Sequence, residues 1–302
     1  MTLILGVTGS GKGSLAFELA RRCNAEIISV DSMKIYRDMD IGTAKPPQQR
    51  REQIRHHLID VVDPSEPFNA GIFLEKAEEA IEQIKSTGRH IIAVGGTALY
   101  IKALMYGLFE GPGSNELIRG RLQERCRGEG LNKLYAELEE TDPEAASNIH
   151  PNDRKRIIRA LEVFQLTGKP ISSHQRQWSN RKMRHNWHII GLRREKELES
   201  RRINQRVKRM IDEGLVNEVK QLLKRHSPLS PQAACAIGYA EITDHLNGLL
   251  SLEKAVERIK INTRRLAKGQ RTWFKTFREV NWIDIDPDER TEDILKKTLN
   301  LK

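Results

Sequence analysis

Short apolar runs alternate with amphipathic stretches along much of the chain. Four runs have the length and composition of buried strands, at residues 2–5, 26–30, 91–94 and 186–192. A further apolar run at residues 58–62, closed by Asp63-Pro64, predicts a shorter strand. The stretch from Asn69 to Lys85 has apolar side chains on one helical side, and Asn69 is a good helix cap. This alternation predicts an α/β fold, a parallel sheet flanked by helices.

The part of the chain from about residue 115 to residue 168 has a different pattern. It lacks strand-like runs, and its apolar spacing predicts four helices, at residues 117–125, 131–139, 143–148 and 154–167. A strand pattern returns at residue 186 and would rejoin the sheet. We therefore expect an inserted all-helical domain at residues 114–185, within a catalytic core formed by residues 1–113 and 186–302.

The composition is that of a globular protein with unevenly distributed charge. Of the 302 residues, 38% are hydrophobic and 30% charged, and no apolar run reaches the length needed to cross a bilayer. Three widely separated cysteines and a start without a signal-peptide pattern favour a cytoplasmic setting. The net charge of +10 is concentrated at residues 151–210, which hold 17 Lys and Arg against 5 Asp and Glu. This excess indicates a polyanionic partner or, alternatively, a solvated basic face.

The first candidate for chemistry is the glycine-rich segment from Gly6 to Lys12. It directly follows the first predicted strand and precedes a predicted helix at residues 14–22. Loop amides and the positive end of that helix suit a phosphate oxygen, and Lys12 adds a full positive charge. We interpret it as a P-loop for a diphosphate or triphosphate, the alternative being an ordinary glycine-rich turn between strand and helix.

One position departs from the P-loop pattern. Gly13 stands where such loops have Ser or Thr to hold Mg²⁺, and the hydroxyl comes one residue later, at Ser14. One residue is about 100° of helical rotation, so Ser14 is not a simple replacement. Ser14 is nevertheless the one metal-ligand candidate of this segment.

Asp31 follows the second predicted strand and should lie beside the phosphate loop, because parallel strands end at one edge of a sheet. Its carboxylate could bind metal, accept a proton or merely cap a turn. The strand at residues 91–94 ends in Gly95-Gly96-Thr97, where a P-loop NTPase usually has a metal-holding Asp. This absence argues against a plain ATPase or kinase. His56, His57 and His150 lack metal-ligand spacing.

Two further segments carry cations suited to anionic ligands. Arg202 and Arg206 are four residues apart on a predicted helix, which places both on one face, suited to a diphosphate. A long basic helix is predicted over residues 252–277, and its segment 270–275 interleaves aromatic and basic residues. That pattern is common in nucleic-acid contacts, although Trp273 and Phe274 could equally be core residues.

Together these motifs resemble the tRNA isopentenyltransferase family, the tRNA dimethylallyltransferases. The matching segments are residues 6–12, 30–32, 36–46, 95–100, 150–153, 159–162 and 237–239. The resemblance runs over nearly the whole chain, and residues 40–46 are its most specific part. It implies a P-loop NTPase-like fold with an inserted helical domain that holds the anticodon arm of tRNA. It also implies transfer of a dimethylallyl group from dimethylallyl diphosphate to the exocyclic amine of the adenosine 3′ of the anticodon, with Mg²⁺ as cofactor.

The resemblance also implies roles for individual residues. Catalytic roles fall on Asp31 as proton acceptor, Thr97, Lys12 and Arg206. Diphosphate binding falls on Gly6, Val7, Thr8, Gly9, Ser10, Gly11, Lys12, Gly13, Arg202 and Arg206. Contacts with tRNA fall on Asp31, Ser32, Met33, Lys34, Thr97, Arg119, Arg156, Ile157, Ile158, Arg159, Ala160, Lys268, Gln270, Arg271 and Lys275. Gly13 and Gly269 depart from the family pattern, the first where the family has Thr or Ser and the second where it commonly has Arg.

This chemistry fits the residues. An allylic diphosphate ionises readily once its leaving group is neutralised, and a carboxylate helps a weakly nucleophilic adenine amine by taking its proton. The target base must leave its stack, so we expect a channel between core and insertion. We expect a monomer without membrane contact. The alternatives are an isopentenyltransferase acting on free adenine nucleotides, a P-loop small-molecule kinase, or a non-catalytic RNA-binding protein with a decayed P-loop.

Overall fold

The computed structural model describes residues 1–108, 111–174 and 182–301. It divides the chain into two compact units, each described here by itself. Unit 1 comprises Met1–Met105 and His185–Lys302, and unit 2 comprises Tyr106–Arg184. The inserted domain was expected at residues 114–185; unit 2 begins eight residues earlier and ends one residue earlier.

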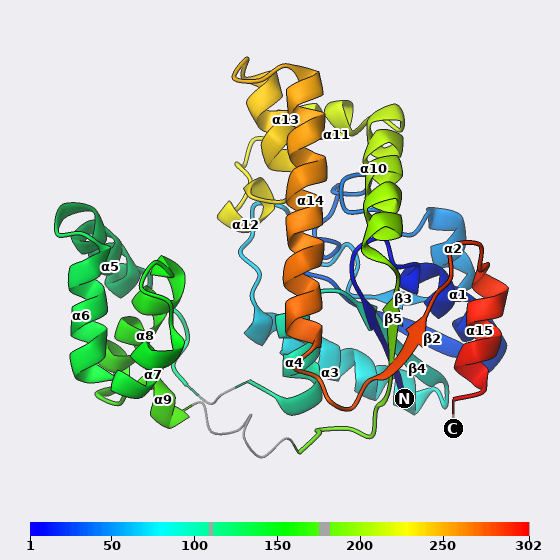
Figure 1. Cartoon of the computed structure of the whole chain (residues 1–302), viewed down its shortest axis with the longest axis horizontal. Coiled ribbons are helices and arrows are strands. Elements are labelled where there is room, and N and C mark those ends of the chain that lie inside the picture. Colours follow the sequence, from blue (N-terminus) through cyan, green and yellow to red (C-terminus); the bar gives the residue numbers. More distant parts are fainter. Residues whose placement is uncertain (109–110, 175–181, 302) are drawn as a thin grey trace. The chain divides into compact units, whose positions relative to one another are not determined.

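Unit 1 is built on a parallel sheet with the strand order β3-β2-β4-β1-β5-β6 (Figure 1). The strands are β1 (Thr2–Gly6), β2 (Ala25–Val30), β3 (His56–His57), β4 (His90–Gly95), β5 (His188–Arg193) and β6 (Asn281–Asp284). The predicted parallel α/β fold is thus confirmed, including the return of the chain to the sheet as β5, which pairs with β1.

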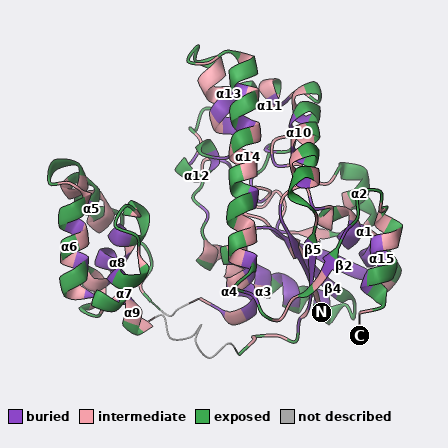
Figure 2. Ribbon diagram, in the orientation of Figure 1, coloured by how far each residue is buried: buried purple, intermediate pink, exposed green. Residues whose placement is uncertain are grey.

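Ten described helices belong to unit 1. They are α1 (Lys12–Cys23), α2 (Gln48–Gln53), α3 (Ala70–Ser86), α4 (Ala98–Tyr106, which ends at the boundary of the units), α10 (Lys196–Asp212), α11 (Leu215–Leu223), α12 (Pro231–Ala234), α13 (Tyr239–Leu246), α14 (Leu252–Phe274) and α15 (Thr291–Leu299). Helices α1 and α15 pack over one side of the sheet, where Leu15 and Leu295 share a core with Ile4. Leu3 and Leu5, which alternate with Ile4 along β1, are fully buried too, so both sides of the strand are covered (Figure 2).

The helix predicted from Asn69 shows how local rules determine an element. The Asn69 side chain accepts hydrogen bonds from the backbone N–H groups of Gly71 and Ile72, which would otherwise lack partners at the first turn. The five predicted apolar positions, Phe73, Ala77, Ala80, Ile81 and Ile84, are all buried. The residues therefore specify both the start of α3 and its buried side.

The predicted strand at residues 58–62 is wrong. The edge strand β3 lies just before it, and only Val62 forms an isolated bridge, with Tyr36. Leu58 and Asp60 have positive φ angles of 61° and 58°, which an extended strand does not allow. Ion pairs that Lys45 and Arg51 make with Asp60 hold this bend, and the apolar pattern alone gives no sign of them.

Unit 2 is helical in its described residues. It contains α5 (Glu116–Gly128), α6 (Leu131–Thr141), α7 (Pro143–Asn148), α8 (Arg154–Thr167) and α9 (Ile171–His174). The sequence predicted the bounds of α7 and α8 as observed. Leu122, Leu134, Leu138, Ile157 and Leu161 lie in one apolar core shared by these helices.

No described helix in either unit combines the length and the apolar character that crossing a bilayer would require.

Candidate active site

The segment from Gly6 to Lys12 forms a tight loop between β1 and α1. Gly9 and Gly11 have φ angles of 81° and 99°, which favour glycine. The backbone N–H groups of Ser14 and Leu15 donate to the Gly11 carbonyl, so the helix begins directly after the loop. The first turn of α1 has no side-chain cap and no acidic residue. Its positive end is therefore available to an anion.

Lys12 and Arg206 bring two half-buried cations to this loop. The Lys12 ammonium donates to the Val7 carbonyl at 3.1 Å, and the Arg206 guanidinium donates to the Thr8 hydroxyl at 3.3 Å. Burial lowers the pKa of Lys12 to about 7, with smaller contributions from the charges of Lys34 and Arg206. Burial also lowers the pKa of Arg206. A bound anion would relieve this repulsion, so the loop is poised for a phosphate group.

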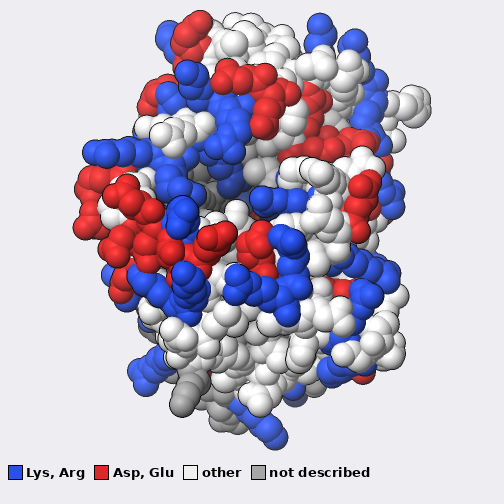
Figure 3. All heavy atoms as spheres, turned by 90° about the vertical axis from the view of Figure 1, so that its right-hand side faces the viewer, with Lys and Arg blue, Asp and Glu red and all other residues white. Residues whose placement is uncertain are grey.

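Two further arginines bind the carbonyl groups of the loop. Arg202 donates to the Gly9 carbonyl at 2.8 Å, and Arg194 donates to the Ser10 carbonyl at 3.1 Å. Both therefore help to hold the loop peptides in place. Figure 3 shows Lys and Arg side chains gathered around a hollow on one face of the protein. Sequence reasoning missed Arg194, because it follows β5 without any motif and is separated from the loop by some 180 residues.

Asp31 and Thr97 meet at the ends of the adjacent strands β2 and β4. One Asp31 oxygen, Oδ1, accepts hydrogen bonds from the N–H groups of Met33 (2.9 Å) and Lys34 (3.2 Å). The Thr97 hydroxyl accepts one from the Ser32 N–H at 3.1 Å. Among the described residues, no hydrogen bond or ion pair involves the second oxygen of Asp31. The turn is thus held by one carboxylate oxygen, which leaves the other available to a ligand.

The glycines after β4 have a steric explanation. A Cβ on Gly95 would lie 1.9 Å from the Val30 carbonyl oxygen, so only glycine lets β2 and β4 end this close together. The metal-holding Asp of a P-loop NTPase could not take this place without moving the neighbouring strand. The same packing brings Thr97 next to Ser32.

Gln270 of α14 bridges the phosphate loop and the end of β4. Its side-chain oxygen accepts a hydrogen bond from the Thr8 N–H at 2.9 Å, and its side-chain nitrogen donates to the Gly96 carbonyl at 2.8 Å. We expected a tRNA contact from this residue, but its carboxamide lies in the phosphate site.

The specific run at residues 40–46 is held by Glu218 of α11. Three successive backbone N–H groups, those of Asp40, Ile41 and Gly42, donate to its carboxylate at 3.0, 2.7 and 3.1 Å. The Tyr239 hydroxyl donates to the same carboxylate at 2.6 Å. A Cβ on Gly42 would lie 2.4 Å from the Tyr239 ring, which explains the glycine.

The loop held by Glu218 also reaches the phosphate site. The Thr43 carbonyl, one residue beyond Gly42, accepts a hydrogen bond from Arg206 at 3.4 Å. Sequence reasoning did not single out Glu218. Its only signal is an acidic residue on an apolar helix, and that pattern is common on surface helices.

The basic residues predicted on α14 differ in their surroundings. Lys268 and Lys275 are exposed, whereas Arg271 forms an ion pair with the buried Glu199 of α10. Gly269 has open space around its Cβ position. Lys268 and Lys275 are thus free to meet a polyanion, and Arg271 joins two helices that lie side by side (Figure 1).

In unit 2, the predicted tRNA residues fall into three groups. Ile157, Ile158 and Ala160 are buried in the apolar core, so their side chains are not available to a ligand. Arg119 and Arg159 both bind the fully buried carboxylate of Glu162, at 2.9 and 2.6 Å. Arg159 also donates to the carbonyls of Pro112 and Gly113. Arg156 is exposed, with Asp153 as its ion-pair partner at 3.4 Å.

Metal ligands are scarce in the described residues. No three His, Cys, Asp or Glu side chains gather there into a group that could hold a metal ion. Gly13 offers no side-chain oxygen, and Ser14 is half-buried on the first turn of α1. His57 does not belong to such a group, and its Nε2 atom lies 2.6 Å from the carboxylate of the buried Glu26.

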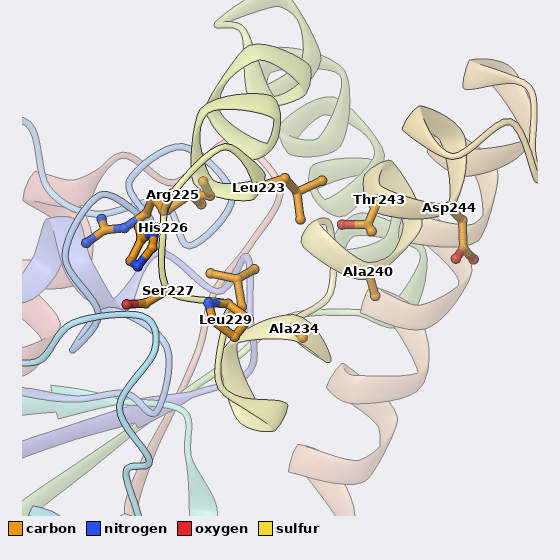
Figure 4. A pocket seen from close by; sticks show the side chains of 11 residues that line it. Leu223, Arg225, His226, Ser227, Leu229, Ala234, Ala240, Thr243 and Asp244 are labelled. Carbon is orange, nitrogen blue, oxygen red and sulfur yellow. The ribbon is translucent and has the colours of Figure 1, made fainter.

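A separate cavity of about 450 Å³ lies beside α11 and α13 (Figure 4). Leu223, Arg225, Leu229 and Asp244 are among the residues that line it, and none of the residues predicted for the site does. The cavity is therefore not part of the candidate active site, which lies at the phosphate loop.

Known proteins resemble this chain in sequence and in structure. The model of a family described as IPP transferase matches residues 34–277. The tRNA dimethylallyltransferase of Geobacter metallireducens is 47% identical over 94% of this chain and 92% of its own length. That of Acetivibrio thermocellus is 45% identical over 99% of this chain and 95% of its own length.

Two solved structures are similar to this one. The tRNA isopentenylpyrophosphate transferase of Bacillus halodurans has a TM-score of 0.70 at 39% identity, with 99% of this chain and 95% of that chain covered. A eukaryotic dimethylallyltransferase acting on tRNA has a TM-score of 0.81 at 29% identity, with 99% of this chain and 77% of that chain covered.

Proposed function

The chain belongs to the IPP transferase family, and from that premise we propose that it is a tRNA dimethylallyltransferase. In this proposal the donor is dimethylallyl diphosphate, and the acceptor is the exocyclic amine of the adenosine 3′ of the anticodon. The observation that carries the proposal is the pairing of a cationic phosphate loop with Asp31 and Thr97 at adjacent strand ends. A leaving group with negative charge and an acceptor that must lose a proton need these two elements.

The phosphate site stabilises the leaving group. The bond between the allylic carbon and the diphosphate oxygen breaks, and the negative charge that develops on diphosphate is met by the loop amides, Lys12 and Arg206. Arg202 and Arg194 hold the peptides of the loop from their carbonyl side. Because these donors are in place beforehand, little reorganisation is needed when the bond breaks.

Asp31 takes the proton that the adenine amine gives up as the new carbon–nitrogen bond forms. Its Oδ1 is engaged by two backbone N–H groups, which fixes the carboxylate and leaves the other oxygen to act as general base. Thr97 accepts from the Ser32 N–H at 3.1 Å and donates to the Ser32 hydroxyl at 3.5 Å, a long hydrogen bond that a bound substrate can replace.

Mg²⁺ is a proposed cofactor, and the protein offers few side chains that could coordinate it. The described residues do not fit a magnesium ion held by the protein alone, so no step above depends on one. A Mg²⁺ ion would then depend on the substrate and on water for its ligands, since this ion keeps several waters readily. Gly13→Thr should then lower the Mg²⁺ concentration needed for half-maximal rate, and Ser14→Ala should leave it unchanged. A worse Mg²⁺ dependence in Ser14→Ala would instead assign the ion to Ser14.

The exposed cations Arg156, Lys268 and Lys275 are the proposed contacts for the anticodon arm of tRNA. They can meet phosphate groups without first giving up a partner buried in the protein. The proposal includes a monomeric enzyme in the cytoplasm.

The direct test is mass spectrometry of tRNA nucleosides after incubation of unmodified tRNA with the protein and dimethylallyl diphosphate. One adenosine per tRNA, next to the anticodon, should gain a dimethylallyl group. A parallel incubation with adenosine monophosphate tests the alternative acceptor. Modification of the mononucleotide but not of the tRNA would overturn the proposed acceptor.

A further inference from the structure

The position of Gln270 has a consequence for the size of the anion that the phosphate loop accepts. Its carboxamide makes two hydrogen bonds that tie the loop to the end of β4, one from the Thr8 N–H and one to the Gly96 carbonyl. Both polar ends of the side chain are therefore used inside unit 1. One N–H of the phosphate loop is already occupied by a neutral acceptor of the protein itself.

This carboxamide lies next to the ammonium group of the loop lysine. A Cβ built on Gly96 would lie 2.6 Å from the Gln270 nitrogen and 3.5 Å from the Lys12 nitrogen. The two groups thus flank the same point, between the loop and the end of β4. In P-loops generally, the loop amides hold the inner phosphates and the lysine reaches towards the last one. A third phosphate would extend into the place that Gln270 fills.

We propose that Gln270 sets the length of the anion, so that the loop accepts a diphosphate and excludes a triphosphate. The inference rests on the proposed function, since it takes the diphosphate of the prenyl donor as the natural ligand. It makes Gln270 a specificity-determining residue. Nucleoside triphosphates share the diphosphate unit and would otherwise compete for the same loop amides and cations.

The helix that carries Gln270 is held in place by its neighbours. Ala267 and Phe274 flank it on α14 and are buried, and Arg271, the next residue, is paired with Glu199. A third phosphate must therefore break both hydrogen bonds of the carboxamide while the helix stays in place. The loss of two neutral hydrogen bonds corresponds to a discrimination of about tenfold to thirtyfold.

The test compares two inorganic anions that differ by one phosphate. Binding of pyrophosphate and of tripolyphosphate to the full chain is measured by titration calorimetry at one fixed excess of Mg²⁺, for wild type and Gln270→Ala. Wild type should bind pyrophosphate about tenfold to thirtyfold more tightly than tripolyphosphate, and in Gln270→Ala this ratio should approach one. Gln270→Asn, whose side chain is too short to span both partners, should shift the ratio in the same direction.

Gln205→Ala on α10 is the matched control, because this exposed glutamine lies next to Arg206 in sequence. It should keep the wild-type ratio. A general loosening of the loop would weaken both anions equally, so the ratio separates exclusion from loss of structure. Thermal unfolding of each variant checks that it is folded.

The possible outcomes separate this inference from the proposed function. If wild type prefers pyrophosphate and both Gln270 variants keep the same ratio, the role of Gln270 is wrong and the diphosphate site stands. Equal binding of the two anions by wild type would also overturn the role of Gln270. If wild type binds neither anion and also transfers no dimethylallyl group, the assignment of the phosphate site is itself wrong.

Discussion

Replacing Glu218 by Gln tests whether one side chain holds the loop at residues 40–43. The carboxylate accepts four hydrogen bonds, from the N–H groups of Asp40, Ile41 and Gly42 and from the Tyr239 hydroxyl. Gln keeps the shape but has only one acceptor oxygen. If that oxygen stays with Gly42 and Tyr239, the new amide nitrogen points its own hydrogens at two N–H donors.

The expected loss follows from these contacts. Hydrogen bonds to a charged acceptor contribute about 1.5–3 kcal/mol each, and two of the four are lost. The free energy of unfolding should therefore fall by about 3 kcal/mol or more. Because the loop also positions the Thr43 carbonyl, which accepts from Arg206, the affinity for pyrophosphate should fall roughly tenfold, or about 1.4 kcal/mol.

Urea unfolding and titration with pyrophosphate measure the two effects separately. Glu241→Gln is the matched control, since the carboxylate of Glu241 likewise accepts hydrogen bonds, from the Gly238 N–H and the Asn262 side chain, both at 2.7 Å. It should lower stability but leave pyrophosphate affinity within about twofold. An unchanged stability in Glu218→Gln, or an equal loss of pyrophosphate affinity in Glu241→Gln, would refute the reasoning.

Four further predictions concern single residues. Asp31→Asn keeps the Oδ1 acceptor of the turn but removes the general base. The rate of single-turnover transfer should therefore fall about 10²–10⁴-fold, while tRNA affinity measured by filter binding stays within a few-fold. Near-normal transfer would contradict the role of Asp31 as general base. Lys12 has a pKa of about 7 in the free protein and should be charged beside diphosphate, so pyrophosphate binding should weaken as pH rises above about 7, with uptake of a proton. Calorimetry in buffers of different ionisation enthalpy detects this proton, and in Lys12→Arg the uptake should be absent. Arg156→Ala should reduce the slope of log affinity for tRNA against log salt by about one. An unchanged slope in Arg156→Ala would place that arginine away from tRNA. Arg159→Ala should chiefly destabilise unit 2, because Arg159 binds the buried Glu162.

Several features of this protein are determined by residues that lie close together in the sequence. The cap at Asn69, the buried side of α3 and the phosphate loop between β1 and α1 depend on groups only a few positions apart. Their hydrogen bonds and spacing can therefore be predicted from the sequence itself. The parallel sheet was predictable for a similar reason, because buried parallel strands are apolar along their whole length.

Only the tertiary structure decided which distant side chains complete the site. Glu218 lies some 176 residues from Gly42, and Gln270 lies 262 residues from Thr8. Arg194 reaches the loop from beyond β5. Such contacts depend on how strands and helices are placed, and no local pattern of apolar and polar residues records that placement. The same holds for the wrong strand at residues 58–62, where the ion pairs of Asp60 outweigh the local preference for an extended chain.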